Sequence, residues 1–106
     1  MRVTVTARHC EVSDDLRALA RARVERLARI AGRPHGAHVV FDDLHGVARA
    51  EVRLRTAGGL VCLGRGEGTE HRTALDRAAA RVRRQLDKSP TKRGSAARRR
   101  AARDRR

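Results

Sequence analysis

Residues 47–56 read VARAEVRLRT, and this stretch alternates between small or apolar side chains and charged ones. One set consists of Ala48, Ala50, Val52 and Leu54, and the other of Arg49, Glu51, Arg53 and Arg55. Successive side chains of an extended strand point to opposite faces of its sheet. The stretch therefore predicts a strand in a sheet with one apolar face, which must be covered, and one charged face in water.

Three further segments have an extended character. The segments 36–44 and 60–65 flank the central stretch, and they are separated from it by short breaks at His45-Gly46 and Ala57-Gly58-Gly59. Breaks of this kind predict antiparallel hairpins. Residues 2–8 alternate as well, with valine or alanine on one side and arginine or threonine on the other, which predicts a fourth, half-buried strand.

A helix is predicted between the first strand and the central hairpins. Ser13 followed by Asp14 and Asp15 indicates its start, because the hydroxyl can cap free amides and the carboxylates lie near the positive helix end. Gly32 and Pro34 indicate its end. One apolar stripe at helical spacing consists of Leu16, Leu19, Ala20, Val24, Leu27, Ile30 and Ala31.

A second helix is predicted to open at Thr69 and Glu70 and to end before Pro90. Its apolar stripe consists of Leu75, Ala78, Ala79, Val82 and Leu86. The predicted order is β-α-β-β-β-α. Two amphipathic helices packed on the apolar face of a four-stranded sheet hide all three apolar surfaces, which predicts a two-layer α+β domain.

The length of 106 residues suits one domain of residues 1–88 and a tail of residues 89–106. The tail has no large apolar residue, and it carries eight basic residues and one acid, so we expect it to be disordered when free. No apolar run approaches the roughly 20 residues that a bilayer span needs, and the N-terminus lacks the pattern of a signal peptide. The sequence therefore predicts a cytoplasmic protein without a membrane partner.

The charge balance points to a polyanionic partner. The chain has 26 Lys and Arg against 12 Asp and Glu, a formal net charge of +14, and arginine grips phosphate with two parallel hydrogen bonds. Modules that stack single-stranded bases need exposed aromatic side chains, whereas this chain has Phe41 alone and neither Tyr nor Trp. We therefore expect recognition of phosphate, ribose and shape on a structured RNA.

The candidate binding residues form two groups. A basic ridge opposite the apolar stripe of the second helix consists of Arg77, Arg81, Arg84 and Lys88. Arg26, Arg29 and Arg33 would extend this surface if both helices lie side by side, and Arg23 falls inside the apolar stripe with its charged head reaching outward. In the tail, Arg98, Arg99 and Arg100 are predicted to contact phosphates without sequence specificity, or else to act as a solubilising end.

The sequence gives little indication of a catalytic or metal site. His9, Cys10 and Cys62 lack a paired ligand spacing, so we expect a buried thiol and a surface imidazole, with a thiol or metal enzyme as the weaker alternative. Asp42 and Asp43 are adjacent on a strand, so they point to opposite faces and cannot act as a catalytic pair. We expect no enzyme activity, no cofactor, no bound metal and no small-molecule substrate.

The stretch Gly64-Arg65-Gly66-Glu67-Gly68 lies between a predicted strand and a predicted helix, where a phosphate-binding loop would be found. It lacks the Lys-Ser/Thr pair of such a loop and a parallel βαβ setting. The sequence therefore predicts a flexible connection.

Residues 3–27, VTVTARHCEVSDDLRALARARVERL, resemble the opening of the ribosome hibernation-promoting factor and ribosome-associated inhibitor family. The likeness continues through HVVF at 38–41, RAEVRL at 49–54 and ALDRAAARVRRQLDK at 74–88. It implies the β-α-β-β-β-α fold and occupancy of the small ribosomal subunit where messenger and transfer RNA would pass. The rRNA contacts that it implies are Arg8, Arg23, Arg26 and Arg29, and on the second helix Arg77, Arg81, Arg84 and Lys88.

The chain departs from this family in two places. Gly64 to Gly68 and Arg72 stand where relatives carry more acidic and aromatic residues, and the C-terminal domain with which the long form pairs two ribosomes is expected to be absent. The hypothesis is that the bound domain excludes messenger and transfer RNA sterically. The alternative is a general binder of double-stranded RNA or DNA that acts mainly through its tail.

Overall fold

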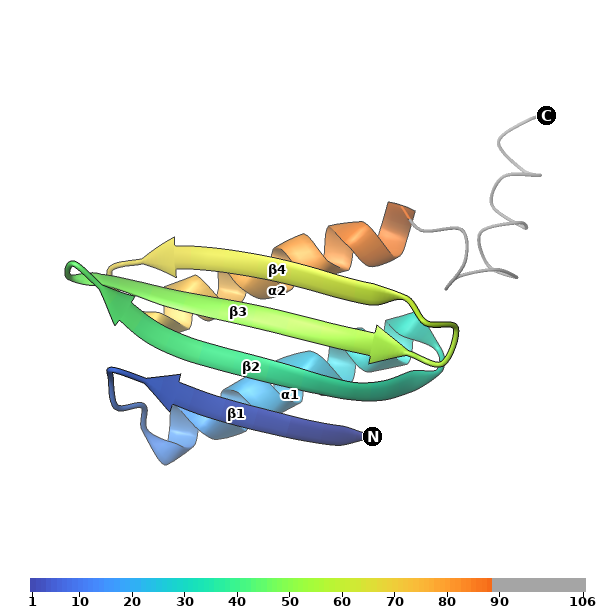
Figure 1. The fold of residues 1–106 in the computed structure, drawn as a ribbon, viewed down its shortest axis with the longest axis horizontal. Helices are drawn as coiled ribbons and strands as arrows, with labels where there is room; N and C mark the ends of the chain where they lie inside the picture. The colour runs from blue at the N-terminus through green and yellow to red at the C-terminus, as the bar shows by residue number, and fades with distance from the viewer. Residues whose placement is uncertain (89–106) are drawn as a thin grey trace.

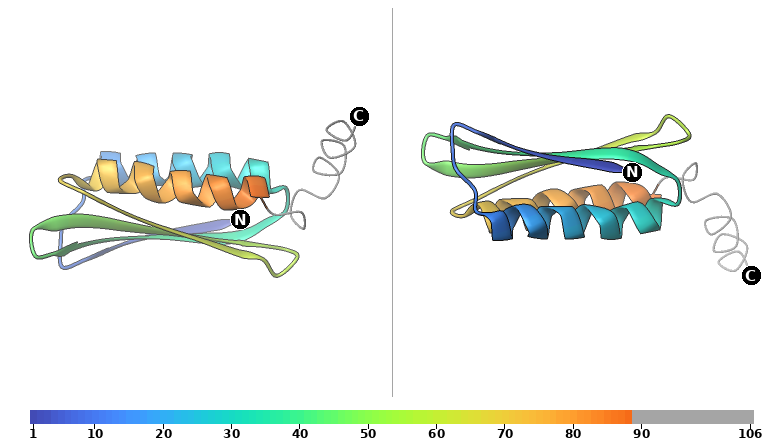
Figure 2. Two further views of the ribbon diagram at one scale, coloured as in Figure 1. Left: turned by 90° about the horizontal axis from the view of Figure 1, so that it is seen from above. Right: turned by 90° about the horizontal axis from the view of Figure 1, so that it is seen from below.

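The computed structural model describes residues 1–88. The elements are β1 (Arg2–Arg8), α1 (Asp14–Ala31), β2 (Pro34–Leu44), β3 (Val47–Thr56), β4 (Val61–Gly68) and α2 (His71–Lys88) (Figure 1). Figure 2 shows the two helices side by side on one face of the sheet, while the other face is open. The predicted two-layer α+β fold and its β-α-β-β-β-α order are confirmed.

The sheet has the strand order β1-β2-β3-β4. β1 is parallel to β2, and the other two pairings are antiparallel, so the hairpins predicted at residues 45–46 and 57–59 are confirmed. The central strand has the predicted alternation: Ala48, Ala50, Val52 and Leu54 are buried, while every second residue from Arg49 lies on the open face. The core lies between this apolar face and the two helices.

Local capping explains where α1 begins and ends. Ser13 Oγ accepts a hydrogen bond from the Leu16 amide at 3.1 Å, as expected of an N-cap serine. Gly32 follows the helix with a φ of 97°, a conformation that favours glycine, and its amide donates to the Ala28 carbonyl at 3.1 Å. Both predicted boundaries of this helix are therefore confirmed.

The prediction of a flexible connection at Gly64 to Gly68 is wrong, because β4 continues to Gly68 and pairs with β3 over this whole stretch. A Cβ placed on Gly64 would collide with the Ala78 carbonyl oxygen of α2, and one on Gly66 with the Ala74 carbonyl oxygen. The helix backbone therefore lies directly on this strand. The glycines allow this close approach, and a glycine-rich pattern alone does not distinguish that role from a loop.

Side chains of α1 cover the outer edge of β1. Arg17 Nη1 donates to the Val5 carbonyl at 3.1 Å, and Arg21 Nη1 donates to the Val3 carbonyl at 2.8 Å. These carbonyl groups would otherwise be open to pairing with another strand. Two arginines that lie outside the apolar stripe of α1 are therefore used to protect a sheet edge.

Side chains of α2 cover the opposite edge at β4. Gln85 Nε2 donates to the Leu63 carbonyl at 2.5 Å, and the Leu63 amide donates to Gln85 Oε1 at 2.9 Å. Arg77 Nη1 donates to the Glu67 carbonyl at 2.6 Å. The Gln85 amide thus satisfies one residue of the edge strand as a neighbouring strand would.

Candidate nucleic-acid interface

The helical layer carries most of the predicted binding residues, and its two helices contact each other along one seam. An ion pair crosses this seam, in which Arg23 Nη1 of α1 lies 2.9 Å from Asp76 Oδ1 of α2. The charged head of Arg23 therefore reaches outward as predicted, but an acid already faces it. The condition that both helices lie side by side is met (Figure 2).

The predicted ridge of α2 is exposed at all four positions, Arg77, Arg81, Arg84 and Lys88. At 100° per residue the ridge lies roughly 110° around the helix from Asp76, so it is turned away from α1 and toward the β4 edge. Arg81, Arg84 and Lys88 line one shallow depression together with Leu63 of β4. The ridge thus borders the sheet edge, and its one tethered member is Arg77, which binds the Glu67 carbonyl.

On α1, Arg26 and Arg29 are exposed on the outer side of the helix, and Arg33 is exposed just beyond its end. Between them and the ridge lies the seam, where Arg83 Nε is 3.5 Å from Asp87 Oδ1. The structure therefore brings these arginines into the same layer as the ridge, with a strip of paired charges between the two groups.

Arg8 lies apart from the helical arginines. It stands at the end of β1 in register with Asp42, and it lines a depression on the open face of the sheet together with Asp42 and Arg49. The predicted contacts at Arg98, Arg99 and Arg100 lie outside the described residues.

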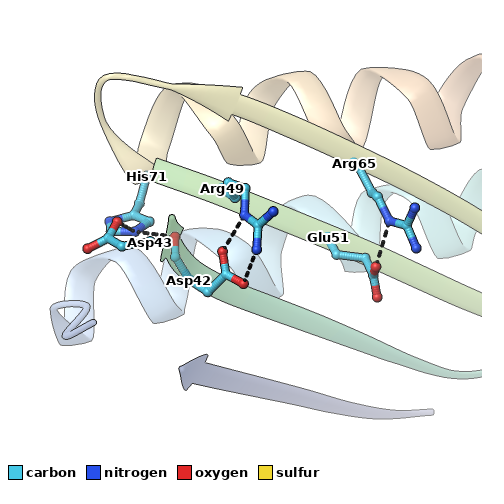
Figure 3. Close-up of polar contacts among 6 residues, drawn as sticks. All are labelled: Asp42, Asp43, Arg49, Glu51, Arg65 and His71. Carbon is cyan, nitrogen blue, oxygen red and sulfur yellow. Dashed lines mark hydrogen bonds and ion pairs between the residues drawn. The ribbon is translucent and has the colours of Figure 1, made fainter. Parts of the chain in front are cut away.

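The open sheet face carries ion pairs between Arg49 and Asp42 and between Arg65 and Glu51 (Figure 3), and Arg53 Nη2 also lies 4.0 Å from Glu51 Oε1. Arg49 forms a two-pronged contact with Asp42, Nε to Oδ1 at 2.7 Å and Nη2 to Oδ2 at 2.8 Å, and Arg65 Nε lies 2.9 Å from Glu51 Oε2. The hydrogen bond from Arg49 lowers the pKa of Asp42, against an opposing effect of burial. Arg49 and Arg65 are thus each paired with an acid within the fold.

Two basic features were not singled out from the sequence. Arg65 belongs to the extended segment predicted at 60–65, and only the packing of α2 on β4 brings it to the depression beside the ridge. At the other end of the open face a basic cluster lines a second depression. It consists of Arg2, Arg53, Arg55, His35 and His38. Strand alternation places four of its members on one face, but only the sheet order brings β1, β2 and β3 together there.

Most of the residues considered as catalytic or metal-binding candidates lie far from one another or point in different directions, and one group is the exception. Asp42 and Asp43 point to opposite faces as predicted, the first toward Arg49 and the second toward His71 of α2. Cys10 follows the end of β1 whereas Cys62 pairs with Leu54, so the register places the two thiols toward opposite ends of the sheet. Within residues 1–88, one group with metal-ligand chemistry comes together, at Cys10, Asp43 and His71.

Neither helix of the described part of the chain is both long and apolar enough to cross a membrane.

Two solved structures share this fold with the chain. A ribosomal subunit interface protein from Coxiella burnetii is 17% identical with a TM-score of 0.75, and the match covers 83% of this chain and 96% of that one. The N-terminal domain of Protein Y from Thermus thermophilus is 26% identical with a TM-score of 0.70, and the match covers 81% of this chain and 96% of that one. No curated protein matches the chain.

The family comparison covers nearly the whole sequence. Residues 3–94 match the model described as sigma 54 modulation protein / S30EA ribosomal protein, which takes in both helices and all four strands. This match and the shared fold confirm the resemblance inferred from residues 3–27. The chain belongs to the sigma 54 modulation protein / S30EA ribosomal protein family.

Proposed function

We propose that this protein binds the rRNA of the small ribosomal subunit near the decoding region and idles the ribosome by excluding messenger and transfer RNA. The observation that carries the proposal is the exposed ridge of Arg77, Arg81, Arg84 and Lys88 on a fold of the S30EA family. The likeness to a ribosomal subunit interface protein and to Protein Y supports the choice of partner. Action at the ribosome would also make the protein cytoplasmic.

The chemistry of the ridge suits the phosphate backbone of a folded RNA. Arginine presents a rigid fork of donors that matches a phosphate oxygen pair, and Arg84 is exposed on the ridge. Phe41, the one aromatic side chain, is fully buried, so base stacking on Phe, Tyr or Trp has no platform here. Affinity would come from counterion release, and it would fall steeply as salt is raised.

Exclusion needs no covalent chemistry, because a folded domain that occupies the path of messenger RNA blocks it by volume. The residues of the hydrophobic core all lie within residues 1–88, so this segment packs as one domain. This supports its assignment as the ribosome-binding domain. We assign residues 89–106 the secondary role of adding affinity through their eight basic residues without adding specificity.

The test is co-sedimentation of the purified full chain with small subunits at moderate salt, together with translation of a reporter in vitro. We expect the protein to sediment with small subunits and to depress translation in proportion to occupancy. A protein that stays in the supernatant, or one that binds and leaves translation unchanged, would contradict the proposal.

Removing residues 89–106 separates this proposal from a general nucleic-acid binder. The shortened chain should retain its preference for small subunits over duplex RNA and DNA, with weaker overall affinity. If the shortened chain lost ribosome binding, or if the full chain bound all three partners equally, the general binder that acts through its tail would be the correct function.

A further inference from the structure

Three potential metal ligands from three separate segments meet at one end of the sheet. Cys10 follows the end of β1, Asp43 lies near the end of β2, and His71 is the first residue of α2. The cysteine sulfur, a carboxylate oxygen of Asp43 and a ring nitrogen of His71 all lie within 4.8 Å of one another. Figure 1 shows why: the ends of both parallel strands and the start of α2 lie at the same end of the molecule.

The imidazole of His71 is held in position from several sides. Its ring packs edge-on against Phe41, with centroids 5.8 Å apart at 84°, and its side chain is only 18% exposed. Its Nε2 lies 3.0 Å from Asp43 Oδ1 and 3.1 Å from the Asp42 carbonyl oxygen (Figure 3). The same ring nitrogen therefore faces two oxygens, and these contacts together with Phe41 fix the orientation of the ring.

Two carboxylates lie near Cys10, since Asp43 is a member of the cluster and Asp42 precedes it on β2. Their negative charges favour a cation at this place, and a bound metal ion would hold the coordinating sulfur deprotonated.

We propose that Cys10, Asp43 and His71 bind a divalent transition metal of the zinc class, with water in the fourth position of a tetrahedron. Thiolate and imidazole select zinc-like ions over magnesium and calcium, which prefer oxygen ligands alone. Neighbouring ligand atoms of a tetrahedral zinc site are about 3.3–3.8 Å apart. The Asp43–His71 pair, at 3.0 Å, would open slightly, and the Cys10 sulfur, which lies within 4.8 Å of both ligand atoms, would move in by up to roughly 1 Å. On binding, the thiol releases its proton to solvent, and His71 gives up its Nε2 contact with the Asp42 carbonyl oxygen, carries its one ring proton on Nδ1 and ligates through Nε2.

The ion would tie the connection after β1, the end of β2 and the start of α2 together. None of these residues belongs to the ridge of α2 or to Arg26, Arg29 and Arg33, and the nearest of the implied rRNA contacts is Arg8, two residues before Cys10. Its expected consequence is stability of this end of the domain, because an ion that binds only the folded state shifts the folding equilibrium.

The experiment titrates the reduced, chelator-treated full chain with Co²⁺ and follows absorption. We expect visible bands of tetrahedral Co²⁺ and a thiolate charge-transfer band, both displaced by Zn²⁺. Cys10→Ser should abolish the charge-transfer band although the Cys62 thiol is retained, and Asp43→Asn and His71→Gln should each weaken binding by more than about tenfold. His35→Gln, an exposed histidine outside the cluster, is the matched control and should leave the affinity unchanged.

Thermal unfolding provides a second readout. With Zn²⁺ at a hundredfold excess over Kd, the Tm of the unmodified chain should rise by roughly 10 °C or more, and that of Cys10→Ser should not. The exposed Asp43 can be changed with little risk to folding, so Asp43→Asn tests the site even if another variant is unstable.

Three results would overturn the proposal. The first is an unmodified chain that binds neither Co²⁺ nor Zn²⁺. The second is an affinity that is unchanged in Asp43→Asn. The third is binding that needs Cys10 but survives His71→Gln, which would assign the ion to Cys10 and its neighbour His9.

Discussion

Arg23 of α1 and Asp76 of α2 form an ion pair across the helix seam, with 2.9 Å between Nη1 and Oδ1. Asp76 Oδ1 accepts no hydrogen bond within the described residues, so the contact is an ion pair held by the attraction of the two charges. Family resemblance implies an rRNA contact for Arg23, but its charge is already balanced within the fold. Its side chain is 33% exposed and that of Asp76 45%, so solvent screens the pair.

We predict that Arg23→Ala lowers the free energy of unfolding by less than about 1 kcal/mol, because exposed ion pairs contribute little. Urea denaturation of Arg23→Ala, Asp76→Ala and the double variant would give the coupling energy. We also expect Arg23→Ala to weaken ribosome binding less than Arg84→Ala does, since Arg84 belongs to the unbalanced ridge. A coupling energy above about 2 kcal/mol would contradict this account of the seam.

Charge reversal should separate a located binding surface from net charge. Arg81→Glu with Arg84→Glu is expected to weaken binding to small subunits by more than tenfold, because it removes two phosphate contacts and adds repulsion. Arg53→Glu with Arg55→Glu makes the same change of charge on the open sheet face and is the matched control. Binding titrations at several salt concentrations would measure the affinity of both double variants for small subunits. An equal loss of affinity in the two variants would show that the ridge is not the interface.

Gly66→Ala should destabilise the domain by about 3 kcal/mol or more, because the new Cβ meets the backbone of α2, which cannot move aside without separating helix and sheet. Gly36→Ala is the control, since a Cβ there lies 3.4 Å from the Arg2 carbonyl oxygen, an ordinary contact. Its effect should stay within about 1 kcal/mol. Denaturant unfolding measures both, and a tolerated Gly66→Ala would contradict the close approach of α2 to β4.

The pair between Asp42 and Arg49 should give stability a dependence on pH. The pKa of Asp42 is lowered in the fold, so the unfolded chain binds more protons in the acid range, and stability rises with pH there. The contribution is complete above the unfolded value of about 3.9 and is lost as pH falls through the lower folded value.

Urea unfolding between about pH 2 and pH 6 would measure the effect of this pair. At about pH 6 the free energy of unfolding of Asp42→Asn should be lower than that of the unmodified chain. The difference between the two free energies should shrink toward zero at about pH 2. Arg49→Met should remove the same dependence. A constant difference across the range would contradict the role of the ion pair.

Much of the fold follows from local chemistry. The alternation of Val3 to Ala7 and of Ala48 to Leu54, and the cap at Ser13, predicted elements that the structure confirms. The ridge of α2 was predictable for the same reason, since a helix face follows from spacing alone. Spacing does not show which neighbouring element a helix face lies beside. Only the structure therefore showed that the ridge of α2 lies next to β4.

By itself, the sequence determined the order of elements, their apolar faces and the concentration of positive charge, because these depend on residues close together in the chain. The tertiary structure alone decided which distant residues meet. The glycines of β4, which were expected to form a loop, lie in a strand on which α2 packs closely. Arg23 forms an ion pair with Asp76, and Cys10, Asp43 and His71 lie close together at one end of the sheet. Such contacts depend on strand order and register, which pair residues across long separations and leave no periodic trace in the sequence.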